Sequence, residues 1–107
     1  MGWIAVDLDG TLAEYDLWRG GEHIGKPIPA MAFRVKKWLA EGKDVRIFTA
    51  RASVPEQIPY IVDWCIKHFN SALPVTNVKD FAMIELWDDR AIQVEANTGR
   101  RMDGKSG

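Results

Sequence analysis

The stretch GWIAVDLDGTL, residues 2–12, decides the fold of this chain. Its apolar first half, residues 2–6, is followed by a turn with Gly10, a pattern that predicts a buried strand. Two carboxylates, Asp7 and Asp9, come one residue apart where this strand leaves the sheet. Open α/β sheets bind their ligands outside the carboxyl ends of the strands. The stretch therefore predicts an α/β fold with an acidic site at the end of its first strand.

Composition indicates one soluble globular domain. The chain has 107 residues, of which 47% are hydrophobic and 27% charged, and its formal net charge is −1. Such a chain can bury a core without disulfides, and its charge gives no reason to expect nucleic acid or a membrane as partner. There is no run of 18 apolar residues and no signal-peptide pattern. Because the single cysteine, Cys65, cannot form an internal disulfide, we expect a cytoplasmic protein.

The middle of the chain predicts a loop, two helices and a strand. Residues 13–25 are polar and glycine-rich and predict a loop or a short flap. A helix follows Pro29 and ends near Gly42, and a strand over residues 45–48 comes next. Because Pro59 cannot sit inside a regular helix that begins at Ser53, we expect an irregular turn and a helix that begins near Ile58. The apolar stripes are Met31, Val35, Trp38 and Leu39 in the first helix, and Ile58, Ile61, Val62, Cys65, Ile66 and Phe69 in the second.

The last third of the chain predicts short strands over residues 74–78, 83–87 and 91–94, and a loose tail over residues 95–107. Alternating strands and helices favour three layers, with a mostly parallel sheet flanked by helices. Only three residues separate Lys79 from the strand at 83–87, too few for a crossover helix. Either this connection is tight and irregular, or one of the two strands is an antiparallel edge.

Polar residues that can handle phosphate follow several of these strands. Asp7 and Asp9 follow the first, Thr49 the second and Asp88-Asp89 the one at 83–87, while Lys79 follows the strand at 74–78. In a parallel sheet these ends lie along one edge. Asp88-Asp89 alone would equally fit a surface turn, and Thr49 alone a helix cap, so the pattern as a whole carries the prediction.

This pattern resembles the haloacid dehalogenase (HAD) superfamily, whose four motifs occur in this order. The resemblance covers residues 3–90, and its first motif, DLDGT, is the most specific part. Lys79 matches the third motif, since Lys67 belongs to the preceding helix. The resemblance implies a Rossmann-like, HAD-type catalytic domain over residues 1–94. It also implies a capless domain, because only residues 13–29 and one helix lie at the two places where caps are inserted.

What the resemblance implies for chemistry is a phosphatase. Asp7 would be the nucleophile that forms an aspartyl-phosphate. Magnesium, a hard cation that prefers oxygen ligands, would be held by Asp7, the main-chain carbonyl of Asp9 and Asp88, with Asp89 holding a bound water. Asp9 would be the general acid and base, and family members with aspartate at this position are phosphatases and phosphomutases. The missing cap favours the phosphatase, because phosphomutases must keep water from the intermediate.

The resemblance also suggests how a substrate is held. Thr49, the neighbouring amide of Ala50 and Lys79 would hold the phosphoryl oxygens. Capless relatives act on large substrates or cover their site by forming oligomers, and similar short members occur in phage genomes. By analogy we expect a phosphorylated small molecule, a nucleotide or a polynucleotide end as substrate. Candidates for gripping the leaving group are Tyr15, Trp18, Arg19, His23 and Arg51.

Other interpretations of these residues remain open at the sequence level. A calcium-binding EF-hand loop is disfavoured, because Leu12 and Trp18 stand where such a loop needs glycine and glutamate. Arg51 fits a phosphate grip and a structural salt bridge equally well. Cys65 and His68 are three residues apart on a helix, but the apolar stripe favours core packing over metal binding. The whole chain also fits a catalytically weak protein that binds a phosphorylated ligand, or a subunit whose site a partner completes.

Overall fold

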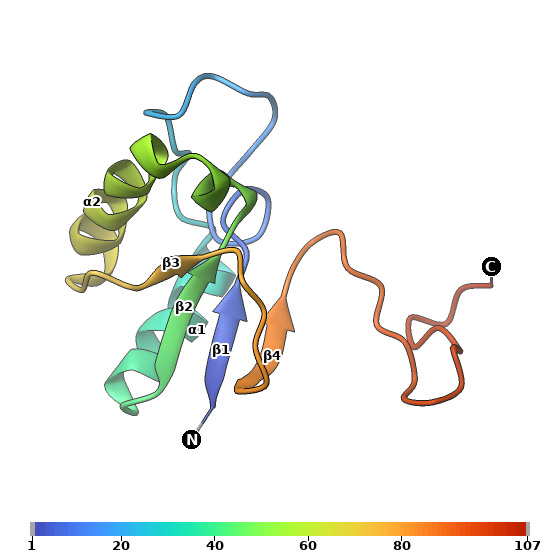
Figure 1. Ribbon diagram of the computed structural model, residues 1–107. Helices are drawn as coiled ribbons and strands as arrows, with labels where there is room; N and C mark the ends of the chain where they lie inside the picture. The colour runs from blue at the N-terminus through green and yellow to red at the C-terminus, as the bar shows by residue number, and fades with distance from the viewer. Residues whose placement is uncertain (1, 107) are drawn as a thin grey trace.

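The computed structural model, which describes residues 2–106, shows a small α/β fold with an all-parallel sheet and two α-helices (Figure 1). The strand order is β3-β2-β1-β4, so β1 lies at the centre and β4 at an edge. Two 3-10 turns, η1 (Ala50–Ser53) and η2 (Pro55–Gln57), link β2 to α2. The longer elements are β1 (Trp3–Val6), α1 (Pro29–Ala40), β2 (Asp44–Phe48), α2 (Ile58–Phe69), β3 (Val75–Thr76) and β4 (Met83–Trp87). This architecture is compatible with a Rossmann-like fold.

Both helices pack on the same face of the sheet. Ile4 and Val6 of β1 are in register with Val45 and Ile47 of β2, and these four side chains belong to one buried cluster. The same cluster contains the buried residues of α1 and of α2, which are Met31, Ala32, Val35, Ile61, Trp64, Cys65 and Phe69. The prediction of three layers is therefore wrong for the described residues. Right-handed crossovers between strands that follow one another in one direction place their helices on one side.

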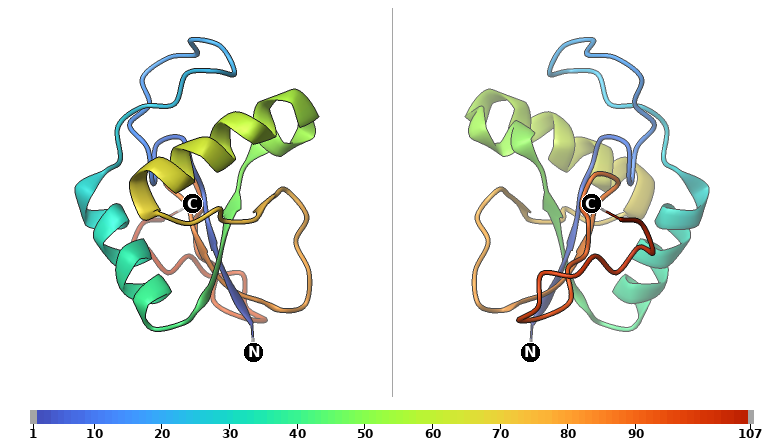
Figure 2. Two further views of the ribbon diagram at one scale, coloured as in Figure 1. Left: turned by 90° about the vertical axis from the view of Figure 1, so that its left-hand side faces the viewer. Right: turned by 90° about the vertical axis from the view of Figure 1, so that its right-hand side faces the viewer.

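The opposite face is crossed by the β3–β4 connection, residues 77–82 (Figure 2). This segment contains no helix, and it links strands at opposite edges of the sheet that both run parallel to their neighbours. The tight, irregular connection is thus the alternative that the structure adopts. Trp3 is 1% exposed beneath it, and its indole Nε1 donates a hydrogen bond of 2.8 Å to Asp80 Oδ1. The Arg46 guanidinium lies over the Trp3 ring, 4.6 Å from its centroid.

Helix α2 begins at Ile58, as the position of Pro59 predicts. The buried side of the helix differs from the predicted apolar stripe at two residues. Ile66 belongs to the stripe but is exposed, and Trp64 lies outside the stripe but is buried. The Trp64 indole reaches the carbonyl of Gly25 with a hydrogen bond of 3.0 Å, so the helix turns this aromatic toward the loop after β1. None of the described helices is long and apolar enough to cross a membrane.

The chain after β4 leaves the body of the protein (Figure 1). The predicted strand over residues 91–94 does not form, and only Val94 makes an isolated bridge, to Arg101. Beyond it, residues 95–106 turn back on themselves, with Glu95 N donating to Arg100 O at 2.7 Å and the two side chains forming an ion pair at 2.8 Å. A fifth strand would need a place beside β4, and this local turn carries the chain away from that edge.

We predict that Asp80 stabilises the connection over Trp3. The Asp80→Ala substitution removes the acceptor for the buried indole Nε1 and for the amide of Ala82. An unsatisfied buried donor costs about 1–3 kcal/mol, so we expect the free energy of unfolding to fall by about that amount. Urea unfolding measures this change. The matched control is Asp103→Ala, which removes a surface ion pair with Arg101, where a loss of about 0–1 kcal/mol is expected. Equal effects of the two substitutions would contradict the prediction.

Candidate functional site

A cleft of about 660 Å³ lies at the carboxyl ends of the strands. The residues that follow each strand line it, together with part of the flap, which we define as residues 13–28 between the first motif and α1. The lining contains Asp7, Asp9, Tyr15, Trp18, Phe48, Thr49, Ala50, Arg51, Val54, Gln57, Asn77, Asp88, Asp89 and Arg90. The parallel sheet thus brings the predicted polar residues after β1, β2 and β4 to one place.

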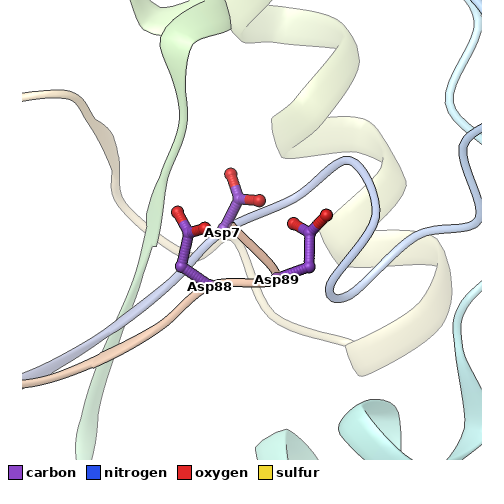
Figure 3. A group of neighbouring side chains, drawn as sticks. All are labelled: Asp7, Asp88 and Asp89. Carbon is purple, nitrogen blue, oxygen red and sulfur yellow. The ribbon is translucent and has the colours of Figure 1, made fainter. Parts of the chain in front are cut away.

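Three carboxylates in this cleft form a group that could hold a metal ion. Asp7, Asp88 and Asp89 each offer an oxygen, and these atoms all lie within 4.8 Å of one another (Figure 3). The group arises from strand pairing, because the amide of Asp7 donates a hydrogen bond of 2.9 Å to the carbonyl of Trp87 at the end of β4. Carboxylate oxygens clustered in this way are the ligands that Mg²⁺ prefers.

Thr11 and Gly10 hold this group together. The Thr11 hydroxyl lies 2.9 Å from Asp89 Oδ1 and 3.3 Å from Asp7 Oδ2, and it accepts a hydrogen bond of 2.9 Å from the amide of Asp89. Gly10 has φ of +88°, and a Cβ there would stand 2.7 Å from Asp89 Oδ2. The glycine is therefore required both for the turn and for the approach of Asp89. Thr11 was not among the predicted site residues, although it belongs to the DLDGT motif that pointed to the site.

The carboxylates perturb one another. Burial, followed by the charges of Asp88 and Asp89, raises the pKa of Asp7 from 3.8 to about 7. For Asp89, burial acts to raise the pKa, but hydrogen bonds with Thr11 and Asp7 outweigh it and the net pKa is lowered. Asp7 thus holds a proton more readily than Asp89 does. A divalent cation placed among these oxygens would relieve the same repulsion, so the residues present fit a magnesium ion.

Asp9 points away from this group and pairs with Arg51. The guanidinium binds both carboxylate oxygens, with Nε–Oδ2 and Nη2–Oδ1 distances of 2.8 Å each. Arg51 is 6% exposed, and Asp9 is 22% exposed. Of the two sequence interpretations of Arg51, the structure therefore shows the salt bridge. Whether the main-chain carbonyl of Asp9 binds a metal stays a prediction.

Thr49 is buried, lines the cleft and caps η1. Its hydroxyl oxygen accepts a hydrogen bond of 3.2 Å from the amide of Arg51. A hydroxyl that accepts in this way still has its proton to donate. Thr49 and the neighbouring Ala50 thus stand at the end of β2 with donors available to a ligand in the cleft.

Three predicted residues, Lys79, Arg19 and His23, are not among the described residues that line the cleft, and His23 lines the same separate cavity as Arg19. Lys79 is exposed in the β3–β4 connection and is not among the described lining residues, because β3 ends at Thr76 and Asn77 takes the position at the cleft. Arg19 forms an ion pair with Asp16 within the flap and lines a separate cavity of about 450 Å³. Of the predicted flap residues, Trp18 and Tyr15 line the cleft, and both are about half exposed.

The cleft also contains residues that the sequence did not single out. Asn77 follows β3, and Arg90 follows the pair of aspartates after β4. Position after a strand was the one signal that could have found them. Cys65 lies in the core, where burial raises the pKa of its thiol to about 12, and His68 packs edge-on against Trp64. These contacts agree with core packing and not with a Cys-His metal site.

Comparisons with known proteins bear on the fold alone. No family model matches the chain, and no curated protein sequence does. The structure is similar to that of a conserved protein coded by a locus of Bacteroides thetaiotaomicron, with a TM-score of 0.64 and 22% sequence identity. The superposition covers 84% of this chain and 77% of that one. The likeness supports a shared α/β fold with a parallel sheet.

We predict that Asp7 makes the metal-free protein less stable as pH rises. Its folded-state pKa of about 7 exceeds the ordinary value of 3.8, so the folded protein keeps a proton that the unfolded chain loses. The contribution of Asp7 to stability is therefore full below pH 3.8, falls as pH rises and is lost above about 7. Asp7→Asn removes this dependence, and we expect it to melt at a higher temperature than the parent at pH 8 with chelator present.

Thermal unfolding of both proteins between pH 4 and 8 checks this expectation. Adding Mg²⁺ at pH 8 should raise the melting temperature of the parent and leave Asp7→Asn much less affected. The control is Asp63→Asn on the exposed side of α2, which should follow the parent. Parallel pH profiles for the parent and Asp7→Asn would show that the carboxyl group is not perturbed.

Proposed function

We propose that this protein is a HAD-type, magnesium-dependent phosphatase that hydrolyses phosphate monoesters. The observation that carries the proposal is the group of Asp7, Asp88 and Asp89 at the ends of two paired strands, with Thr49 on the same cleft. The DLDGT motif supports it, because its two aspartates, its glycine and its threonine each have a distinct role in the geometry of this site.

Asp7 would act as the nucleophile. One of its carboxylate oxygens forms a bond to phosphorus while the bond from phosphorus to the ester oxygen breaks, which leaves an aspartyl-phosphate. Mg²⁺ held by Asp7 and Asp88, with Asp89 in support, would supply positive charge that lets the two anions meet. Thr49 and the amide of Ala50 would hold the equatorial phosphoryl oxygens.

Asp9 would move the protons. It gives a proton to the departing alkoxide in the first step. In the second it takes a proton from the water that attacks phosphorus, while the bond from phosphorus to the Asp7 oxygen breaks and inorganic phosphate leaves. The positive charge that the sequence assigned to Lys79 has a better-placed source in Arg90, which lines the cleft. The cleft is open, and the half-exposed rings of Tyr15 and Trp18 at its rim favour a nucleotide or a polynucleotide end as substrate.

Two observations support a second candidate. Lys79 lies outside the cleft, and Asp9 is held in an ion pair, so the arrangement also suits a protein that binds Mg²⁺ and a phosphorylated ligand with little turnover. A site completed by a second chain would give the same picture. Both alternatives keep the binding of metal and phosphate. They differ from the enzyme because the single chain by itself would turn over little substrate.

We predict metal-dependent phosphate release that Asp7→Asn abolishes. The assay follows inorganic phosphate from nucleoside monophosphates, sugar phosphates and oligonucleotides with a 5′- or 3′-phosphate, with Mg²⁺ and with chelator. Asp7→Asn protein serves as the blank, because an amide cannot form the aspartyl-phosphate. Release that persists in the blank would contradict the assignment of Asp7. Silence of folded protein that binds Mg²⁺ would favour the binding protein, and activity that rises with the mass seen by light scattering would favour the completed site.

We predict that Asp9→Asn separates proton transfer from metal binding. Loss of the acid–base group should lower kcat by roughly 10²–10⁴-fold. Mg²⁺ affinity, measured by calorimetry, should change little, because the carboxylate of Asp9 pairs with Arg51 and is not a member of the metal-binding group. A loss of Mg²⁺ binding comparable to that in Asp7→Asn would mean that the Asp9 carboxylate is itself a ligand.

A further inference from the structure

Arg51 uses nearly all of its hydrogen-bonding capacity within the protein. Two of its bonds go to the carboxylate of Asp9, one of 3.0 Å goes to the carbonyl of His23, and one of 3.3 Å goes to the carbonyl of Gly21. A guanidinium has five N–H donors, so these four bonds leave one for anything else. The Trp18 ring covers its face, with the guanidinium carbon 4.9 Å from the ring centroid. A side chain so occupied is poorly suited to grip a phosphate.

These contacts join three parts of the chain. Asp9 belongs to the motif after β1, Arg51 to η1 after β2, and the two carbonyls to the tip of the flap. The base of the flap is held separately, by a hydrogen bond of 2.8 Å from Glu14 N to Lys26 O and by the bond from Trp64 to Gly25. Between residues 15 and 24, the hydrogen bonds that the structure shows to other parts of the described chain all come from Arg51.

We infer that Arg51 is a positioning residue that couples the flap to Asp9. This inference rests on the proposed function, and it assigns Arg51 to the flap and the acid–base group instead of to the phosphate. The bidentate pair fixes the orientation of the Asp9 carboxylate, since a planar fork matches both oxygens at once. Each oxygen keeps a second lone pair, so the paired carboxylate still has a place for a proton. The same guanidinium contacts the ring of Trp18, which lines the cleft, and binds the two carbonyls of the flap tip.

The first test reads the flap without any activity. Trypsin can cut after Arg19, which is exposed at the flap. Loss of the charged hydrogen bonds in Arg51→Gln should raise the rate of this cut about tenfold or more, measured by mass spectrometry of the fragments. The cut after Arg100 in the tail is the internal reference and should not change. The matched control is Arg46→Gln, because Arg46 makes the same bidentate pair with Asp44 away from the cleft.

A double substitution tests the coupling itself. Asp9→Ala removes the anchor that aims the guanidinium, so alone it should also speed the cut after Arg19. In the Arg51→Gln background it should add nothing, because both substitutions break the same link. Independent effects of the two substitutions, or no effect of Asp9→Ala, would overturn the coupling. This arm decides the inference even if the protein proves not to be a phosphatase.

The second test separates positioning from phosphate binding, with p-nitrophenyl phosphate as substrate and inorganic phosphate as inhibitor. As a positioning residue, Arg51 should affect kcat, so Arg51→Gln and Arg51→Lys should both lower kcat about tenfold or more while KM and inhibition by phosphate stay near the parent values. Lysine keeps the charge but lacks the fork, so it should not rescue. Weakened phosphate inhibition in Arg51→Gln, restored by lysine, with unchanged flap cleavage, would show that Arg51 is a phosphate ligand.

Discussion

The site depends on one constraint, which is that Asp7 and Asp88 follow parallel strands that pair with each other. The hydrogen bond from Asp7 N to Trp87 O ties the two strand ends together, so the sheet keeps the main chain of Asp7 close to that of Asp88. Folding buries Asp7 and holds it near the charges of Asp88 and Asp89, and burial, followed by these charges, raises its pKa. Thr11 relieves part of it by bridging Asp7 and Asp89. A proton or a cation among these oxygens would stabilise the folded protein, so the site favours the binding of either.

The pairing of β1 with β4 in turn depends on an unusual connection. A right-handed crossover from β3 to β4 would normally place a helix on the second face of the sheet, and here six residues cross that face without one. In place of a helix, the connection covers the buried Trp3. The indole Nε1 of Trp3 donates a hydrogen bond to Asp80, and the Arg46 guanidinium lies over its ring. The layer on this face of the sheet is therefore thin, which keeps the domain small. The shortness of this connection also explains why Lys79 lies outside the cleft, since the chain must turn away from the end of β3 at once.

Much of this could be predicted from the sequence, for reasons that are visible at particular residues. The apolar run before Asp7 gave β1, the segment at 83–87 gave β4 with its observed bounds, and Pro59 placed the start of α2. Prediction failed where tertiary contacts decide. Residues 91–94 satisfy a strand pattern but pair with no strand of the sheet, and only Val94 bridges locally to Arg101. Ile66 fits the helical stripe but is exposed, whereas Trp64 is buried and bonds to the carbonyl of Gly25. The pair between Asp9 and Arg51 joins residues 42 apart, which local patterns do not show.

The charges of the cleft explain why the metal and the clamped arginine belong together in the proposed mechanism. Four aspartates and two arginines line it, so with every group ionised the cleft carries a net charge of −2. Arg51 is matched by Asp9, and what remains is Arg90 against Asp7, Asp88 and Asp89, which leaves the approach of a phosphate dianion unfavourable. A divalent cation at the three carboxylates balances this negative charge and makes the approach possible. Because the charge of Arg51 is balanced by Asp9, the metal has to supply the attraction for the phosphate. The role left to Arg51 is to orient Asp9 and the flap.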